Sequence, residues 1–575
     1  MQQETKIFGG QIPDYPTAFD RVTVEGNSEM LYAPETNEAT YLSYLKTLEQ
    51  AGFKKYTEDT LASSRFATYV KDGVSVLCGF DPIAGIARII PDRITVLPPR
   101  AEDAKLPQCF DKTLLTQLKL NNLNNDCGMC YTIRLKDGRF LLFDGGCRDH
   151  EDEIKLYELL KSQCPAGKEP VIAAWFLSHA HGDHYGNFFA LMERYREQIK
   201  VEMMVYNLPT DAILLTQTHE NYESRIAAAL AEIDAPTVYA RTGQRFHFGD
   251  TVVETIFASE DFYPEKMKAS RENDFSVVFR VVSDGQTIMM LGDSEKCGAA
   301  EMCRRYGAWM KSDIMQQSHH GFWAGSPELY ELIDPETVIW PCPFHWYYNL
   351  YDGNCNSLSN AVIHNSKNVK EVLLSSVDTY VLTLPYHPKK ENRPENIRFT
   401  YADGDVISNA DFGGIRYLFE LGWSYINTND WNEKNFTFDV PGVLLVEKNG
   451  IRGAQITGNK YSLLNVVRPE LMRGVNAYTV EMEMDIEKRG DSISVWYNDA
   501  QPVNRSNRSH YTVNRSGKVN LILSVNRTAG TTKVYIDGKL TEILKNDSND
   551  EGGIQLLSQS SDVFLTKLTV TAGEK

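Results

Sequence analysis

The spacing of apolar and polar residues changes twice along the chain and divides it into three parts. In the first part, residues 1–100, a helical pattern over 39–53 precedes two alternating runs joined by Asp72-Gly73. An Asp-Gly pair between alternating runs favours a tight β-hairpin. We therefore predict a small α+β domain over residues 1–100, and no residue pattern in it indicates chemistry.

The second part, residues 105–390, consists of short apolar runs that alternate with longer amphipathic stretches. The runs include VIAAWFLSH (171–179) and SDIMQQSHH (312–320), and the amphipathic stretches include EDEIKLYELLKS (151–162) and GNFFALMERYREQ (186–198). Strands that alternate with helices pack most economically as sheets flanked by helices. The pattern predicts an α/β domain.

The last part, residues 436–575, is nearly pure strand by pattern and follows a connector over residues 391–435. Strands at this spacing, separated by turn residues, predict an all-β antiparallel sandwich. The run TTKVYIDGKL (531–540) resembles the strand-turn-strand of concanavalin-like jelly rolls. That resemblance implies a domain that either binds glycan or only packs against an enzyme.

Composition limits the partners and the location of the protein. The chain has 575 residues and a net charge of -18, and it lacks the clustered Lys and Arg of a nucleic-acid groove. Its N-terminus has no apolar segment typical of a secretory signal, and no stretch has the length of a membrane span. The ten cysteines form no disulfide framework. We expect a cytoplasmic protein that binds neither nucleic acid nor membrane.

The strongest chemical signal is the segment His179-Ala180-His181-Gly182-Asp183-His184, which follows a buried strand. Side chains two apart at a strand end point the same way, so His179 and His181 can share one ion. Asp183 and His184 can then reach a second ion about 3.5–4 Å away. Imidazole and carboxylate ligands without thiolates suit zinc, manganese or iron at a catalytic site with an open position.

This motif resembles the hallmark of the metallo-β-lactamase superfamily, and other elements extend the resemblance in the same order. Asp144-Gly145-Gly146 is similar to the element that orients the metal loop. Asp293 resembles the carboxylate that bridges both metals, and His319-His320-Gly321 resembles the last metal-ligand motif. The resemblance implies an αββα sandwich for the central domain.

The order NDFSVVF, TIMMLGD, HHG resembles one branch of the superfamily in particular. That branch contains the hydrolase domain of bacterial competence proteins and the phosphorylcholine esterases. The resemblance implies a hydrolase in which two divalent ions, zinc or alternatively manganese or iron, activate a hydroxide that attacks an ester. Together with the negative charge, it favours a small phosphoester and phosphodiesterase-like activity. The alternatives are a lactone, thioester or amide hydrolase, and a glycan-binding module with a weakly active hydrolase domain.

The resemblance also assigns roles to individual residues. The expected metal ligands are His179, His181, Asp183, His184, Asp293 and His320. Asp183, Asp293 and His319 are the expected catalytic residues, with His319 as an acid or oxyanion donor facing the substrate. Because neighbours in a strand point to opposite faces, the roles of His319 and His320 could also be exchanged.

One superfamily element is missing from the sequence. Many members supply a third histidine to the first metal from a Gly-His-Thr element, but the corresponding strand end here reads FASEDFYP (257–264). Asp261 or Asn273 could replace that histidine, and His219 and His247 are further alternatives. Otherwise, the first ion has fewer protein ligands.

Two further segments have both a chemical and a structural interpretation. The aromatic run FHWYYNLYDGN (344–354), which includes His345, could form a wall that stacks on a planar or quaternary-ammonium group, or it could be packed loop core. Phe322 and Trp323, which follow the HHG motif, differ from the small residues common in the resembled branch. Cys127 and Cys130 are either small structural residues or a redox or zinc pair.

Overall fold

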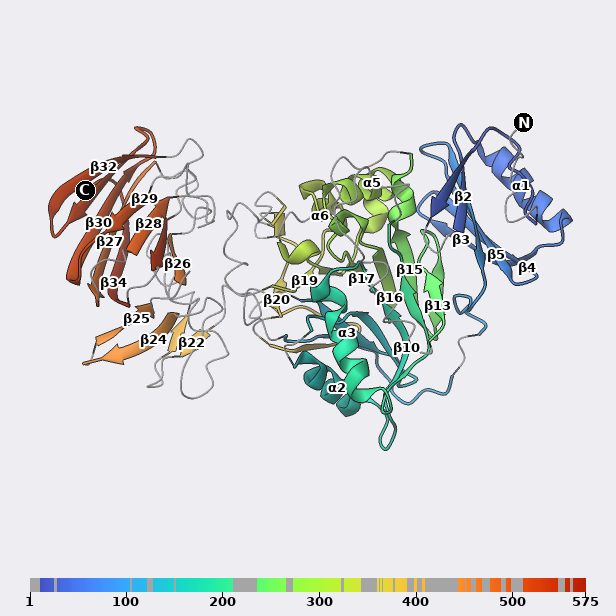
Figure 1. Ribbon diagram of the computed structural model, residues 1–575, viewed down its shortest axis with the longest axis horizontal. Coiled ribbons are helices and arrows are strands. Elements are labelled where there is room, and N and C mark those ends of the chain that lie inside the picture. The colour runs from blue at the N-terminus through green and yellow to red at the C-terminus, as the bar shows by residue number, and fades with distance from the viewer. Residues whose placement is uncertain are drawn as a thin grey trace.

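The structure is a computed structural model that is rich in β-sheet and has few helices (Figure 1). The described residues are 11–24, 28–103, 106–120, 128–148, 151–209, 235–264, 272–321, 325–342, 359–360, 362–363, 366–375, 378–389, 398–400, 406–408, 443–449, 451–456, 462–467, 476–487, 493–497, 510–546, 554–558 and 562–575. Within these ranges, every helix is too short or too polar to span a bilayer.

The N-terminal part is an antiparallel sheet of six strands in the order β1-β2-β6-β5-β4-β3. The strands are β1 (Asp20–Val24), β2 (Ser28–Ala33), β3 (Lys54–Leu61), β4 (Ser64–Lys71), β5 (Val74–Asp81) and β6 (Ile86–Arg93). The predicted hairpin between β4 and β5 is confirmed. Asp72 and Gly73 both have positive φ, 48° and 76°, as a two-residue type I′ turn requires.

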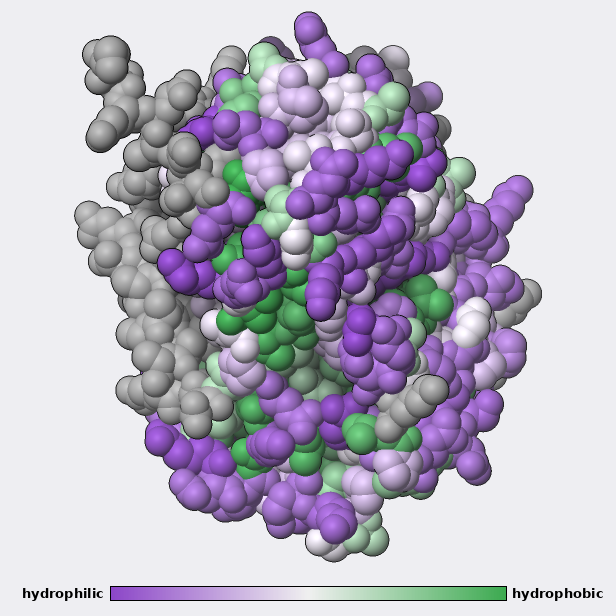
Figure 2. Space-filling view, turned by 90° about the vertical axis from the view of Figure 1, so that its right-hand side faces the viewer, coloured by the Kyte–Doolittle hydropathy of each residue, from purple (hydrophilic) through white to green (hydrophobic). Residues whose placement is uncertain are grey.

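Helix α1 (Glu38–Gln50) packs on this sheet, as the apolar spacing over 39–53 predicts. The side chain of Asn37 accepts a hydrogen bond from the backbone N–H of Thr40 and so caps the helix. Tyr41 of the helix stacks on Phe80 of β5 with ring centroids 5.4 Å apart. The outer surface on this side of the molecule is mostly hydrophilic (Figure 2). The apolar residues are therefore buried between helix and sheet.

The central part contains two sheets, and the strands of the first lie in the order β13-β12-β10-β9-β8-β7-β21, with β11 beside β10. They are β7 (Leu114–Gln117), β8 (Cys130–Arg134), β9 (Phe140–Asp144), β10 (Val171–Phe176), β11 (Lys200–Val201), β12 (Met204–Tyr206), β13 (Thr237–Tyr239) and β21 (Tyr380–Thr383). Strands β9, β10, β12 and β13 run parallel, so their carboxyl ends share one edge of the sheet.

The second central sheet has the order β14-β15-β16-β17-β18-β19-β20. Its strands are β14 (Arg245–Phe248), β15 (Thr251–Phe257), β16 (Val278–Ser283), β17 (Gln286–Met290), β18 (Ile314–Gln316), β19 (Thr337–Trp340) and β20 (Glu371–Leu374). Strands β17 to β20 are parallel, so loops that follow them also emerge at a common edge.

The two central sheets share a hydrophobic core, and helices pack against their other faces. Phe143 of β9 and Phe176 of β10 both contact Phe279 of β16, with ring centroids 5.9 and 5.0 Å apart. The helices are α2 (Asp152–Gln163) and α3 (Gly182–Tyr195) on the first sheet, and α5 (Lys296–Tyr306) and α6 (Pro327–Ile333) on the second (Figure 1). Helix α6 was not expected from the apolar spacing.

Ion pairs and hydrogen bonds connect the N-terminal sheet to the central part. Asp81 at the end of β5 accepts a hydrogen bond from Arg304 of α5 at 2.6 Å. The guanidinium of Arg88 donates to the backbone oxygen of Asp261 at 3.2 Å, and the buried Arg305 pairs with the carboxylate of Asp261 at 2.8 Å. Because buried charges are stable only when paired, these contacts fix the position of the Asp261 segment.

The described residues from 443 onward form strands and no helix. One sheet has the order β24-β25-β34-β27-β30-β31-β32 and the other β26-β33-β28-β29. The strands are β24 (Val443–Lys448), β25 (Ile451–Ile456), β26 (Ser462–Val467), β27 (Ala477–Ile486), β28 (Ile493–Tyr497), β29 (His510–Val513), β30 (Gly517–Asn526), β31 (Thr531–Ile536), β32 (Lys539–Lys545), β33 (Ile554–Ser558) and β34 (Val563–Ala572). In the predicted connector, the described residues pair as β22 (Arg398–Thr400) and β23 (Val406–Ser408). The predicted domain boundaries stay predictions.

Candidate metal centre

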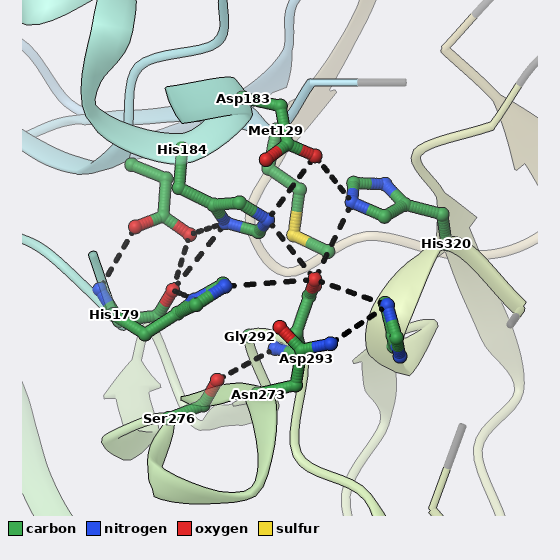
Figure 3. A network of polar contacts seen from close by, with 12 residues as sticks. Met129, His179, Asp183, His184, Asn273, Ser276, Gly292, Asp293 and His320 are labelled. Carbon is green, nitrogen blue, oxygen red and sulfur yellow. Dashed lines mark hydrogen bonds and ion pairs between the residues drawn. The ribbon is translucent and has the colours of Figure 1, made fainter. Parts of the chain in front are cut away.

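The predicted metal ligands converge from loops at the carboxyl ends of strands in both central sheets (Figure 3). His179 follows β10, Asp293 follows β17, and His320 follows β18. Open α/β sheets commonly bind ligands at this edge, because loops that follow parallel strands meet there. The topology therefore brings together residues that are more than a hundred positions apart in the chain.

The histidine segment is divided between a loop and a helix. Helix α3 begins at Gly182, with His181 as its N-cap residue, so Asp183 and His184 lie in its first turn. The apolar pattern predicted a helix start at Gly186, which is wrong because the polar first turn has no apolar periodicity. An aspartate is favourable in a first turn, where the helix dipole is positive.

The ligand atoms form two groups, in each of which they lie within 4.8 Å of one another. The first group contains His179, His181 and Asp293, and the second contains Asp183, His184 and His320. Asp293 Oδ2 lies between them, 3.7 Å from His179 Nε2 and 3.2 Å from His184 Nε2. Among the described residues, the geometry thus brings all six predicted ligands into one centre.

Asp144 orients the histidine segment from the end of the neighbouring strand β9. Its Oδ1 accepts a hydrogen bond from the backbone N–H of Ser178, and its Oδ2 accepts one from the Ser178 hydroxyl, both at 2.8 Å. The same Oδ2 lies 2.8 Å from His184 Nδ1. A carboxylate that holds one imidazole nitrogen leaves the other to face a metal. Asp144 therefore directs Nε2 of His184 toward Asp183 and Asp293.

His319 and His320 both face the centre, which corrects the expectation from strand alternation. Strand β18 ends at Gln316, and the doublet lies in a turn where His319, His320 and Gly321 have φ of 44°, 53° and 93°. Three successive left-handed residues turn both imidazoles to the same side. Their Nε2 atoms lie 3.7 and 3.6 Å from Asp293 Oδ2.

The surroundings of the doublet hold this strained turn in place. The indole N–H of Trp340 donates to the backbone oxygen of His320 at 2.9 Å, and the amide of Asn360 donates to that of Gly321 at 2.8 Å. Left-handed backbone costs a non-glycine residue about 1–2 kcal/mol. Such strain persists only where neighbouring contacts determine the conformation.

The buried polar atoms of the centre fit divalent cations. Within the described part of the chain, Nε2 of His179, His184 and His320 and Oδ1 of Asp293 are buried without a hydrogen-bond partner. Buried polar groups are otherwise nearly always paired. Imidazole nitrogens and carboxylate oxygens directed at one another across a few ångströms form a donor set that suits zinc, manganese or iron.

The charges of the centre are strongly coupled. Burial disfavours the imidazolium, but Asp293, Asp183 and Asp144 outweigh it and raise the pKa of His184 well above its usual value. Burial likewise disfavours the ionised form of Asp293, but His184, His320 and His319 lower its pKa well below the usual range. The carboxylates are thus anionic and attract cations.

The segment that lacks the third histidine does not supply another ligand in its place. The carboxylate of Asp261 pairs with Arg305 and accepts a hydrogen bond from Thr242 at 2.5 Å, so it lies in the contact with the N-terminal sheet. His247 lies on β14 and belongs to neither ligand group. His219 lies outside the described residues. Of the alternatives that the structure describes, Asn273 alone contacts a residue of the centre, with its amide nitrogen 3.0 Å from Nε2 of His319.

Glu295 is a buried residue of the centre that sequence patterns did not identify. Its Oε1 lies 3.3 Å from His319 Nδ1 and accepts a hydrogen bond from the amide of Asn273 at 3.2 Å. The amide nitrogen of Asn273 also lies 3.0 Å from His319 Nε2. The place of Glu295 two residues after Asp293 was the only available signal.

The remaining sequence hypotheses fall partly outside the described residues. The aromatic run 344–354 with His345, the pair Phe322 and Trp323, and Cys127 all lie there. Cys130 is buried in β8, and burial raises the pKa of its thiol. A thiol that resists ionisation is unsuited to redox or metal chemistry.

One family model and several solved structures match parts of the chain. Residues 134–315 match the family model described as "Beta-lactamase superfamily domain". None of the curated proteins compared with this chain matches it. The similar solved structures include the metallo-β-lactamase fold protein YhfI from Bacillus subtilis, with 12% identity, a TM-score of 0.30 and coverage of 47% of this chain and 99% of that one.

Two further solved structures resemble parts of the chain. CmlA, a diiron β-hydroxylase from Streptomyces venezuelae, shares 12% identity with a TM-score of 0.26, covering 41% of this chain and 45% of that one. Zinc-bound PqqB from Methylobacterium extorquens shares 9% identity with a TM-score of 0.24, covering 35% and 71%. Over residues 134–315, the chain resembles a domain of the β-lactamase superfamily.

Proposed function

We propose that the protein is a hydrolase with two divalent metal ions that cleaves a small phosphoester, most simply a phosphodiester. The observation that carries the proposal is the pair of ligand groups that meet at Asp293. On this proposal, the central domain is an αββα sandwich with the centre at one edge.

The residues of the centre divide into ligands and groups that act on the substrate. His179 and His181 would hold one ion, Asp183, His184 and His320 the other, and Asp293 both. When bound, the ions supply Lewis acidity and make water more acidic. The donor set suits zinc, with manganese or iron as alternatives.

His319 is the group that the proposal places beside the substrate. Asn273 lies 3.0 Å from its Nε2 and Glu295 lies 3.3 Å from its Nδ1, and the same Nε2 lies 3.7 Å from Oδ2 of Asp293. On this proposal, His319 acts as the acid or oxyanion donor that the sequence predicts.

The choice of a phosphoester is supported by the order of motifs and by charge. The sequence resembles the branch that contains phosphorylcholine esterases, and a net charge of -18 disfavours a polyanionic nucleic acid. A lactone, thioester or amide is the rival substrate class, because the same ions would activate water toward a carbonyl.

The test combines metal analysis with a substrate panel. Purified protein would be analysed for zinc, manganese and iron, and then assayed with an aryl phosphodiester, an aryl phosphomonoester and a lactone. We expect bound metal and phosphodiester turnover that Asp183→Ala abolishes and His247→Ala leaves unchanged, since His247 lies outside the centre. Turnover of the lactone alone would contradict the phosphoester. Metal-free, inactive protein would favour a binding module.

A further inference from the structure

We infer that the two ion positions have unequal affinities: the ion at Asp183, His184 and His320 is tightly held, and the ion at His179 and His181 exchanges readily. The inference rests on the proposed two-metal function and adds to it which of the two ions stays bound. Three independent features of the described residues lead to it.

The first feature is the number and charge of the ligands. With Asp293 shared, the Asp183 position has four protein ligands, and two of them are carboxylates. The His179 position has three protein ligands among the described residues, and only the shared Asp293 carries charge. A divalent ion gains more electrostatic stabilisation from two carboxylates than from one.

The second feature is the support behind each imidazole. Nδ1 of His184 lies 2.8 Å from the carboxylate of Asp144, and Nδ1 of His320 lies 2.7 Å from the backbone oxygen of Pro341. In contrast, Nδ1 of His179 lies 3.0 Å from the hydroxyl of Ser178, a neutral partner that also contacts Asp144. Partners that orient a ligand raise metal affinity by about 10–100-fold.

The third feature concerns the two acids of the segment that lacks the third histidine. Glu260 accepts hydrogen bonds from the backbone N–H of Thr242 at 2.9 Å and from the amide of Asn207 at 3.1 Å. Asp261 is bound to Arg305 at 2.8 Å. Both carboxylates are therefore engaged in holding the segment in place beneath the N-terminal sheet.

The experiment measures metal binding directly. The full-length protein would be stripped with a chelator, dialysed, and titrated with Zn²⁺ in competition with a chromophoric chelator of known affinity. We expect two classes of site, one ion each, whose affinities differ at least about tenfold. Far-UV circular dichroism would confirm that each variant is folded.

Variants assign each class to its residues. Asp183→Asn keeps the side-chain shape and removes only the charge. We expect Asp183→Asn and His320→Asn each to lower the zinc affinity of the tight class of site at least about tenfold. His179→Asn should weaken only the loose class, and the control His247→Asn should change neither. Equal affinities for both ions, or loss of the tight class of site in His179→Asn, would overturn this inference but not the proposed function. Absence of zinc binding would overturn the proposed function as well.

Discussion

His319 and His320 are adjacent in the chain, yet both present Nε2 to the same oxygen, Oδ2 of Asp293, at 3.7 and 3.6 Å. In a strand, they would point to opposite faces. Here, the left-handed turn that ends in Gly321 redirects both rings, and His320 joins Asp183 and His184. The backbone of this turn is therefore as important to the centre as the imidazoles themselves.

Gly321→Ala should lower the free energy of unfolding by about 2 kcal/mol and weaken zinc binding. A Cβ there would lie 2.8 Å from Cζ2 of the buried Trp340, and Gly321 has a φ of +93°. Urea unfolding and zinc titration would measure both effects. Gly285→Ala is the control, because Gly285 has a φ of +78° but nothing within 4 Å of its Cβ position. Equal effects of the two variants on zinc affinity would contradict the prediction.

Asp144→Asn should reduce zinc affinity about 10–100-fold without removing any ligand. The amide would keep the shape of the side chain but lose the negative charge that faces His184 Nδ1 at 2.8 Å. Competition titration against a chelator would measure the change. Asp137→Asn is the matched control, since Asp137 pairs with Arg139 in the turn between β8 and β9. If the control lost as much affinity, Asp144 would have no specific role.

Glu295→Gln should lower kcat at least about tenfold while the metal content stays unchanged. The carboxylate lies 3.3 Å from Nδ1 of His319 and is not one of the six proposed ligands. Steady-state kinetics on the aryl phosphodiester and metal analysis would test this. In a His319→Ala background, Glu295→Gln should have little further effect, because the two residues act as a unit. Additive losses would refute the proposed coupling.

Asp81→Asn should destabilise the protein by about 3 kcal/mol at pH 7 and much less in acid. Burial favours the neutral carboxyl, but Arg304 and Arg305 outweigh it and lower the pKa of Asp81 below its usual value. A depressed pKa gives stability that is fully present above the unfolded value of about 4 and is lost as the pH falls through the folded value. Thermal unfolding of both proteins at pH 7 and below pH 4 would show the difference shrinking. A pH-independent difference would exclude this linkage.

The local sequence is enough to predict the ligand set of the centre. His179, His181, Asp183 and His184 occur at a fixed spacing after a buried strand, and this local pattern is enough to predict metal binding. Strands β10 and β18 and helices α1 and α2 were also predictable, because each depends on apolar spacing within a short window.

Long-range contacts, in contrast, set which distant residues meet in the centre. The turn that redirects His319 and His320 depends on Trp340 and Asn360, and the role of Glu295 depends on Asn273, which lies on a different loop. These contacts join residues separated by about twenty to forty positions, and the apolar spacing along the chain does not predict them. The absence of Asp261 from the centre follows likewise from its pairing with Arg305, a long-range contact that no local pattern predicts.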